Sequence, residues 1–417
     1  MHPSLEYALV CCLAAAGSFL LTPLVRLVAI RWGAVASPRV RDVHAVAIPR
    51  MGGIALLGGL ALAIGTARQM PTLRSTFETG PDLRWVLVSA AMICALGVVD
   101  DRYELDSVTK LAGQVMATGV MVTVGGVQLV AIYIPWGGGS TLSLGRDIGI
   151  PITILVTVLT INAINFVDGL DGLAAGVAAI ASLAFFVFCY HLAVEDFVEI
   201  WATPVLLTAA LGGTCIGFLP HNFWPARIFM GDSGSMLIGL VLSAAAITAT
   251  TNTDPQGLDG AFGSLPLLFP LLIPVAVLAI PFVDLLLAVL RRVRRGHSPF
   301  APDKQHLHHR LLELGHTHRR AVLLLYFWSA LIAFGGVAFS IMRGVWVVVT
   351  VLAMLTVVGL VMSAVPRLRR MRAAPAVGPM ALPPGLPRVP SVVEPSMIEP
   401  AAAVRAGQAG SATPDRR

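Results

Sequence analysis

Long apolar stretches separated by short polar segments make up most of this chain. The stretches are of a length that can cross the roughly 30 Å hydrocarbon core of a bilayer as helices. Eleven are present, near residues 7–29, 51–67, 85–99, 111–134, 148–161, 173–192, 201–219, 233–250, 265–290, 321–342 and 345–365. The pattern predicts an all-α polytopic membrane protein of about 11 transmembrane helices, with residues 1–365 forming one multi-span domain.

The composition supports the same class. Hydrophobic residues make up 56% of the chain and charged residues 12%, with a mean hydropathy of +0.80. Soluble domains have roughly 25% charged residues, so a soluble fold is excluded. Residues 366–417 are first basic and then rich in Pro and Ala, which predicts a disordered cytoplasmic tail.

Arginines indicate the orientation in the membrane. They gather after odd-numbered spans, within residues 31–50, 291–320 and 367–372. Positive loops stay inside, so these exits are expected on the cytoplasmic side of the inner (plasma) membrane, with the N-terminus outside. The exceptions follow the second span: Arg68, Arg74 and Arg84. Loop arginines facing anionic lipid explain the sequence pI near 9.4, so no nucleic-acid partner is expected.

Four polar islands interrupt the apolar pattern, at residues 98–102, 162–172, 227–235 and 302–310. When the spans are threaded through a bilayer in order, all four islands emerge on the cytoplasmic side. This shared side predicts one active site assembled from cytoplasmic loops and helix ends.

The first island holds two adjacent carboxylates, Asp100 and Asp101, at a membrane boundary. Solvation of a helix end is the simplest interpretation. Neighbouring carboxylates disfavour each other's ionisation, however, so a metal, a proton to be moved or a nearby cation would explain the pair better. Asp106 adds a third acid, and the resulting spacing keeps an isoprenoid diphosphate site open.

In the second island, Asn165, Asp168 and Asp171 recur every three residues, which places them on one face of a helix. The alternative is an Asp-Gly turn. In the third island, Asp232 is expected at a helix start, where it would act as an N-cap or lie beside an anion site made by the helix amides.

The fourth island is rich in imidazole and contains His306, His308 and His309 beside Lys304 and Arg310. The histidine spacing does not match familiar zinc sites, and no cysteine accompanies it. These cationic and imidazole groups suit phosphate contacts. Oxygen donors in the other islands favour Mg²⁺ or Mn²⁺, which bind carboxylates together with substrate phosphates.

Taken together, the islands resemble the polyprenyl-phosphate N-acetylhexosamine-1-phosphate transferases (glycosyltransferase family 4), from about residue 31 to 326. By that resemblance, Asp232 and Asn165 would hold Mg²⁺, or Mn²⁺, against the diphosphate of a UDP-N-acetylhexosamine. Asp100 or Asp101 would deprotonate or position the phosphate of polyprenyl phosphate. The resemblance implies a substrate-binding set of Asn162, Asp168, Asp171, Phe229, Lys304, His306, His308, His309 and Arg310.

Within this set, Asp168 and Asp171 would orient the nucleotide and Phe229 would stack on uracil. Two departures from the family pattern concern the same substrate. Residues 41–44 read Arg-Asp-Val-His where the family commonly has Arg-Lys-x-His, and Lys304 replaces a usual arginine, which loses a bidentate fork.

The interrupted histidine run, with Leu307 inside it, is similar to the branch that transfers GlcNAc-1-phosphate, the first membrane step of cell-envelope polysaccharide assembly. The alternative is the branch that uses UDP-MurNAc-pentapeptide. More remote alternatives are a membrane prenyltransferase and a secondary transporter, although a transporter's ionisable residues should lie near the midplane of the bilayer. The oligomeric state stays open, a homodimer included.

Overall fold

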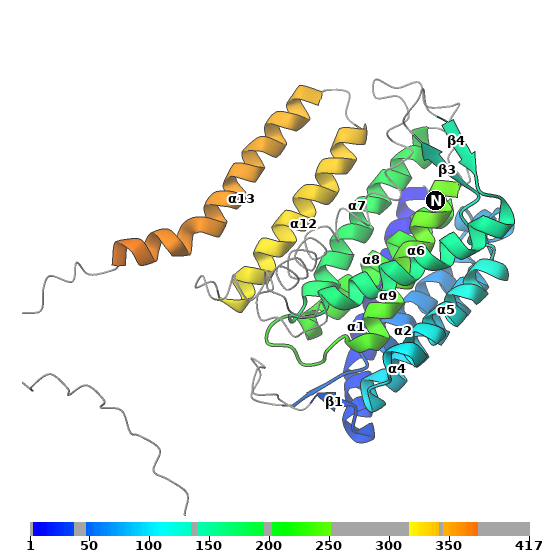
Figure 1. Ribbon diagram of the computed structural model, residues 1–417, viewed down its shortest axis with the longest axis horizontal. Helices are drawn as coiled ribbons and strands as arrows, with labels where there is room; N and C mark the ends of the chain where they lie inside the picture. The colour runs from blue at the N-terminus through cyan, green and yellow to red at the C-terminus, as the bar shows by residue number, and fades with distance from the viewer. Residues whose placement is uncertain are drawn as a thin grey trace, which may run out of the picture. The chain divides into compact units, whose positions relative to one another are not determined.

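The structure is a computed structural model that describes residues 3–36, 47–134, 140–195, 202–251, 317–341 and 345–373. Helices dominate these residues (Figure 1). The helices are α1 (Pro3–Trp32), α2 (Gly53–Ala67), α3 (Thr76–Thr79), α4 (Leu83–Tyr103), α5 (Ser107–Thr123), α6 (Gly145–Val167), α7 (Leu173–Glu195), α8 (Ala202–Asn222), α9 (Gly231–Thr251), α12 (His318–Ile341) and α13 (Val345–Ala373), with a 3₁₀ turn, η1, at Leu73–Ser75.

Eight of the described helices are long and apolar enough to cross a bilayer. They are α1, α4, α6, α7, α8, α9, α12 and α13. The chain is therefore a multi-pass membrane protein, as the hydrophobic pattern predicted. Two further expected spans form the shorter helices α2 and α5, of 15 and 17 residues. The expected span at 265–290 lies outside the described residues.

The expected span at 111–134 is wrong in its second half. Helix α5 ends at Thr123, and a turn follows in which Gly126 has φ +76°, a backbone conformation that favours glycine. The chain then forms strand β3 (Ala131–Ile134), which pairs antiparallel with β4 (Ser140–Ser143). β-branched residues support a strand as well as a membrane helix, so composition alone did not separate the two.

A second small antiparallel pair joins β1 (Val35–Ala36) to β2 (Ile48–Pro49). It closes the segment between α1 and α2, and residues 37–46 within that segment lie outside the described part. The backbone of Arg50 continues the pairing by donating a 2.9 Å hydrogen bond to Ala34. This hairpin fixes the start of α2.

Helix α9 is the centre of the bundle and packs against α4, α6 and α8. Almost all of its membrane-spanning window is buried, and its sequence is rich in Gly, Ser and Ala. Small residues let helix backbones approach closely, which is how helices associate in lipid. A side chain at Gly97 of α4 would overlap the backbone of Ser233 in α9. The small residues therefore bring the last turn of α4 against the first turn of α9.

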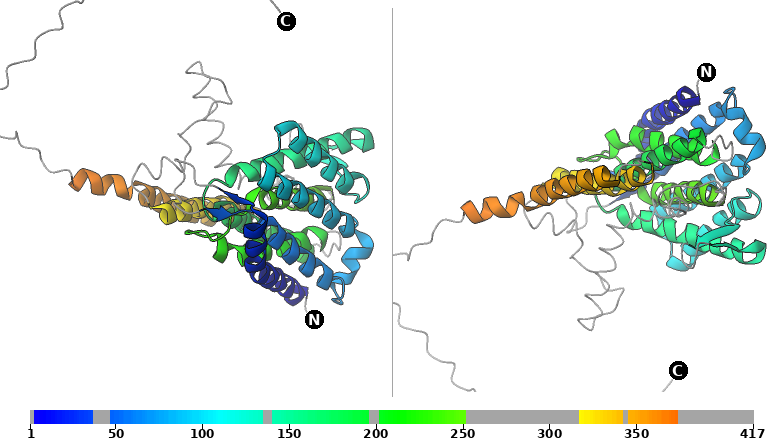
Figure 2. Two further views of the ribbon diagram at one scale, coloured as in Figure 1. Left: turned by 90° about the horizontal axis from the view of Figure 1, so that it is seen from below. Right: turned by 90° about the horizontal axis from the view of Figure 1, so that it is seen from above.

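The two last described helices lie side by side (Figures 1 and 2), and together they line an apolar groove. The outer face of α13 is strongly exposed, with Trp346 83% accessible, which fits a helix surrounded by lipid. Helix α13 runs on to Ala373 through the basic residues, past the expected tail boundary at residue 366. The rest of the expected tail, from residue 374, lies outside the described residues.

Candidate active site

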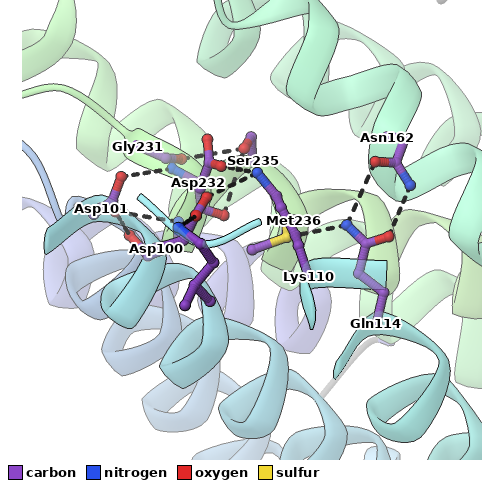
Figure 3. A network of polar contacts seen from close by, with 11 residues as sticks. Asp100, Asp101, Lys110, Gln114, Asn162, Gly231, Asp232, Ser235 and Met236 are labelled. Carbon is purple, nitrogen blue, oxygen red and sulfur yellow. Dashed lines mark hydrogen bonds and ion pairs between the residues drawn. The ribbon is translucent and has the colours of Figure 1, made fainter. Parts of the chain in front are cut away.

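Three of the four polar islands meet at one end of the bundle (Figure 3). Asp100 and Asp101 lie in the last turn of α4, and Asp232 lies in the first turn of α9. Asn165 belongs to the last turn of α6. Because α4 and α6 arrive at this end while α9 leaves it, residues more than 130 positions apart come into contact. The sequence predicted that the islands emerge on one side, and in the structure these three islands do lie at the same end of the bundle.

Asp101 holds the start of α9. Its Oδ1 accepts a 2.9 Å hydrogen bond from the backbone amide of Asp232, and its Oδ2 accepts 2.8 Å and 3.3 Å bonds from the hydroxyl and amide of Ser233. Gly231 has φ +70°, and a Cβ there would collide with the Asp101 carboxylate. The amides at a helix start lack partners within the helix, so Asp101 is a cap supplied by another helix.

This geometry decides between the two roles that the sequence left open for Asp232. The helix begins at Gly231, and the oxygen that caps its first amides belongs to Asp101. The Asp232 side chain is therefore not the N-cap. It points instead to the ammonium group of Lys110, with which it forms an ion pair.

Lys110, in the first turn of α5, lies between two carboxylates (Figure 3). Its Nζ is 2.8 Å from Oδ2 of Asp100 and also contacts Oδ2 of Asp232. With the Asn165 amide oriented to satisfy its neighbours, Nδ2 donates to Oδ1 of Asp232 and Oδ1 accepts from Lys110 Nζ, both at 3.2 Å. One cation is thus surrounded by oxygens from α4, α6 and α9.

Lys110 lies outside the four polar islands and was not among the residues expected at the site. A signal was present, because only two of the 29 Lys and Arg residues are lysines, and both Lys110 and Lys304 lie in or beside polar islands. In a chain that otherwise uses arginine, a lysine indicates that a compact ammonium is needed at that position. The preceding Asp106 caps α5 through the amides of Val108 and Thr109, which explains that acid without a diphosphate.

A cavity of about 330 Å³ opens at this cluster. It is lined by Arg50, Asp100, Asp101, Glu104, Leu105, Ser107, Lys110 and Asp232. The lining combines carboxylates with two cationic side chains, Arg50 and Lys110. A cavity of this kind suits an anionic ligand that binds together with a cation. The cationic side chains would pair with the anion, and the carboxylates would pair with the cation.

Asp168 directly follows α6 and faces the same charges. Asp168 is partly exposed, but the surrounding protein removes much of the water around its carboxyl group. This loss of hydration is the largest cause of a pKa raised to about 7. The negative charges of Asp232 and Asp101 add to that increase. The positive charge of Arg50 opposes it, so Arg50 lies within electrostatic reach of this carboxyl.

Asp171 is turned toward the loop between α8 and α9. It is buried, and its Oδ2 accepts a 2.9 Å hydrogen bond from the backbone amide of Ala226. Further along the loop, the Phe229 amide donates to Pro49, and the Phe229 carbonyl accepts from Gly52. The half-buried Phe229 is therefore held between the α2 entrance and the loop that Asp171 supports.

Asn162 lies one helical turn deeper than Asn165. Its side chain forms a reciprocal amide pair with Gln114 of α5, at 2.8 Å and 3.4 Å. It does not contact the Lys110 cluster. The remaining expected substrate-binding residues, Lys304, His306, His308, His309 and Arg310, lie outside the described residues, as does the segment 41–44.

The oxygen cluster fits a divalent cation that a substrate helps to coordinate. Within the described ranges, no group of three or more His, Cys, Asp or Glu side chains forms a complete metal site. Asp232 and Asn165 nevertheless direct oxygens to one point, now faced by the Lys110 ammonium. Mg²⁺ commonly uses one or two carboxylates and takes its other ligands from water and phosphates, so an incomplete protein set is the expected form.

A polar, charge-lined cavity at the end of a membrane-spanning bundle is typical of a membrane enzyme that acts on phosphate groups. Comparison with known proteins agrees with this class. Residues 83–250 match the family model described as Glycosyl transferase family 4. The chain is 48% identical over 369 residues to the decaprenyl-phosphate N-acetylglucosaminephosphotransferase of Mycolicibacterium smegmatis, covering 88% of this chain and 90% of the relative.

Other relatives extend the comparison. The protein of the same description from Mycobacterium tuberculosis is 46% identical over 334 residues, covering 80% of this chain and 82% of the relative. A probable undecaprenyl-phosphate N-acetylglucosaminyl 1-phosphate transferase of Bacillus subtilis is 30% identical over 310 residues, covering 74% and 77%. The chain belongs to glycosyl transferase family 4, which confirms the resemblance carried by its polar islands.

Proposed function

We propose that this protein transfers N-acetylglucosamine-1-phosphate from UDP-N-acetylglucosamine to a polyprenyl phosphate and releases UMP. The observation that supports this most directly is the cavity where Lys110 lies between Asp100 and Asp232. The sugar follows from the names of the relatives, which describe GlcNAc-1-phosphate transfer to decaprenyl or undecaprenyl phosphate. The high identity to the decaprenyl relatives favours decaprenyl phosphate as the lipid.

The reaction is a displacement at phosphorus. An oxygen of the lipid phosphate forms a bond to the β-phosphorus of the UDP-sugar, and the bond from that phosphorus to the bridging oxygen breaks. The bridging oxygen leaves with UMP, and the bond between the sugar C1 and its oxygen stays intact. Such a transfer depends mainly on positioning and on neutralising charge, which the mixed cationic and acidic lining can supply.

Asp232 and Asn165 are the residues that would hold the metal, with Mg²⁺ or Mn²⁺ as the expected ion because the donors are oxygens. When bound, a divalent cation neutralises charge on the diphosphate. Lys110 lies between Asp100 and Asp232 and neutralises part of their charge. Lys110 and Arg50 then remain available to contact phosphate oxygens in the cavity.

Asp100 is the carboxylate that acts on the lipid phosphate in this proposal, and Asp101 positions α9. Asp100 Oδ1 accepts a 2.8 Å bond from the Leu105 amide, while its Oδ2 faces Lys110 and the cavity. Both oxygens of Asp101 are engaged by the start of α9. A base or positioning group needs an oxygen within reach of the substrate, and Asp100 has one.

The uridine side of the substrate is assigned to the loop region. Asp168 faces the charges of the cluster, Phe229 lies in the loop before α9, and Asp171 supports that loop through Ala226. Stacking of uracil on Phe229 follows from the family resemblance. By the same resemblance His306, His308 and His309 would bind the diphosphate, and the neighbouring Lys304 and Arg310 have the charge for phosphate contacts.

The membrane location suits this chemistry. The lipid phosphate must lie at headgroup depth while its chain stays in hydrocarbon, and the cluster lies where α4 and α6 end and α5 and α9 begin. The arginine pattern assigns this end to the cytoplasm, where a soluble nucleotide-sugar is available. The N-terminus then lies outside.

A substrate comparison tests the proposal. Membranes containing the protein would be given one polyprenyl phosphate and, separately, radiolabelled UDP-GlcNAc, UDP-GalNAc and UDP-MurNAc-pentapeptide. Label should enter lipid only from UDP-GlcNAc, with release of UMP. Equal or faster labelling from the pentapeptide substrate would assign the chain to the other branch. In lipid-free enzyme, exchange of labelled UMP into UDP-GlcNAc would instead indicate a covalent enzyme intermediate.

A further inference from the structure

A second layer of polar contacts lies beneath the Lys110 cluster, on three of the four helices that form that cluster. Gln114 of α5, Asn162 of α6 and Met236 of α9 form it (Figure 3). Gln114 is four residues after Lys110, and Met236 is four residues after Asp232. Asn162 is three residues before Asn165. Helices α5 and α9 leave the site and α6 arrives at it, so these opposite offsets place all three members one turn deeper in the bundle.

The amide groups of this layer satisfy each other. Asn162 Nδ2 donates to Gln114 Oε1 at 2.8 Å and to the Val158 carbonyl at 2.8 Å. Gln114 Nε2 lies 3.4 Å from Asn162 Oδ1 and 3.3 Å from Met236 Sδ. The Gln114 side chain is only 1% exposed. Each amide therefore has its polar atoms paired, as groups placed within a membrane bundle require.

The pair restricts how α5 and α6 can move relative to each other. A shift of either helix along its axis would separate the two amides. The buried Gln114 amide would then lose its partner on Asn162, which costs free energy in a medium of low dielectric. The same shift would move Lys110 relative to Asn165, because each lies one turn from its partner in the layer below. Met236 contacts Gln114 through its sulfur, so α9, which also carries Asp232, is packed against the same pair.

We propose that Gln114 and Asn162 are positioning residues that set the spacing of Lys110, Asn165 and Asp232 for catalysis. The inference rests on the proposed function and departs from the expected role of Asn162 as a substrate-binding residue. It assigns Asn162 to the packing of α5 on α6. A misplacement of reacting groups by about 1 Å can cost roughly 100-fold in rate, so a modest change in this layer should be visible in turnover.

The test exchanges the two amides. Gln114→Asn and Asn162→Gln each change the length of one side chain and keep its amide, whereas the double variant keeps both amides and the combined length of the pair. We expect kcat to fall about 10- to 100-fold in each single variant, with the KM for UDP-GlcNAc changed less than about threefold. The double variant should recover most of the lost kcat.

Two further variants serve as controls. Gln114→Met removes the amide with little change in volume and should resemble the single variants. Thr118→Val lies one turn deeper in α5, at a buried hydroxyl that has no hydrogen-bond partner among the described residues, and should leave kcat and KM unchanged. The thermal unfolding midpoint in detergent identifies any variant that fails to fold, and the remaining variants then decide.

Several outcomes would overturn the proposal. A folded double variant no more active than the single variants would show that the pair does not act as a unit. A raised KM in Asn162→Gln with normal kinetics in both Gln114 variants would return Asn162 to substrate contact. The proposed function fails separately, because it requires the unmodified protein to release UMP from UDP-GlcNAc and polyprenyl phosphate.

Discussion

The backbone amide of Asp232 donates a 2.9 Å hydrogen bond to Oδ1 of Asp101, so a carboxylate of α4 caps the helix that carries the proposed metal ligand. The adjacent Asp100 faces a different partner, the ammonium of Lys110 at 2.8 Å. Two neighbouring carboxylates thus have separate tasks. Asp101 positions α9 and Asp100 pairs with Lys110, although both carboxylates line the cavity.

Exchanging each aspartate for asparagine should separate these tasks. Asp100→Asn is expected to lower kcat about 100-fold or more, because the group acting on the lipid phosphate loses its charge, while thermal unfolding stays close to normal. Asp101→Asn should also lower the unfolding midpoint, by roughly 2–4 °C, since an amide cannot accept all the bonds of the cap. Steady-state kinetics and unfolding of both purified variants provide the comparison. The opposite pattern would make Asp101 the residue that acts on substrate.

Lysine should not be replaceable by arginine at position 110. The ammonium is enclosed by oxygens of Asp100, Asp232 and Asn165, whereas a guanidinium is larger and planar. We expect Lys110→Arg and Lys110→Met both to lose roughly 100-fold or more in kcat/KM. Exposed Arg74→Lys is a matched control, since this side chain is mostly accessible and lies away from the cavity. Near-normal activity of Lys110→Arg would mean that only the charge matters.

Activity should require a divalent cation that binds through Asp232. EDTA is expected to abolish turnover, and Mg²⁺ or Mn²⁺, but not zinc alone, should restore it. Asp232→Asn should lose nearly all turnover at ordinary metal concentrations and fold normally, because the cap of α9 is on Asp101. Metal titrations of UMP release measure this directly. Full turnover after thorough chelation would remove the metal from the mechanism.

Asp168 predicts a pH dependence of stability. Its pKa is raised to about 7 by burial and by the charges of Asp232 and Asp101. The folded state therefore holds the proton more tightly than the unfolded chain, where the pKa is about 3.9. Its stabilising contribution is complete below that value and is lost as pH rises through about 7.

The variant Asp168→Asn has no titrating group at this position, so it should not lose stability through this group as pH rises. The unmodified protein should lose stability between about pH 4 and 7, so the unfolding midpoint of the variant minus that of the unmodified protein should increase over this range and then level off. Thermal unfolding of both proteins across this range, in EDTA and without substrate, tests the sign. A difference that does not change with pH would show that Asp168 titrates like an ordinary surface aspartate.

Much of the architecture could be predicted from the order of apolar and polar residues. Eight of the eleven expected spans form described helices long and apolar enough to cross a bilayer, because a membrane helix needs only its own length and apolarity to be stable there. Two more correspond to the shorter helices α2 and α5. The error at 111–134 arose where a strand pair replaces the end of a helix, at a Gly turn. That choice depends on residues 140–143, which supply the partner strand.

The common end of the first three polar islands also followed from the sequence, since the number of crossings fixes on which side each loop emerges. The partners within the site were not. Lys110 contacts Asp232, and Gln114 contacts Asn162, across 122 and 48 residues respectively. Such pairs depend on which helices pack together and at what depth, as the close backbone approach of Gly97 in α4 to Ser233 in α9 illustrates.

The different partners of Asp100 and Asp101 show most clearly what could not be predicted from the sequence. In the sequence the two acids are neighbours with the same surroundings, and either could serve as the base. In a helix, successive side chains are turned by about 100°, so one points to α5 and the other to α9. The sequence alone determined that two carboxylates lie at a membrane boundary. Only the packing of α4 against its neighbours decided which one caps a helix and which one pairs with Lys110.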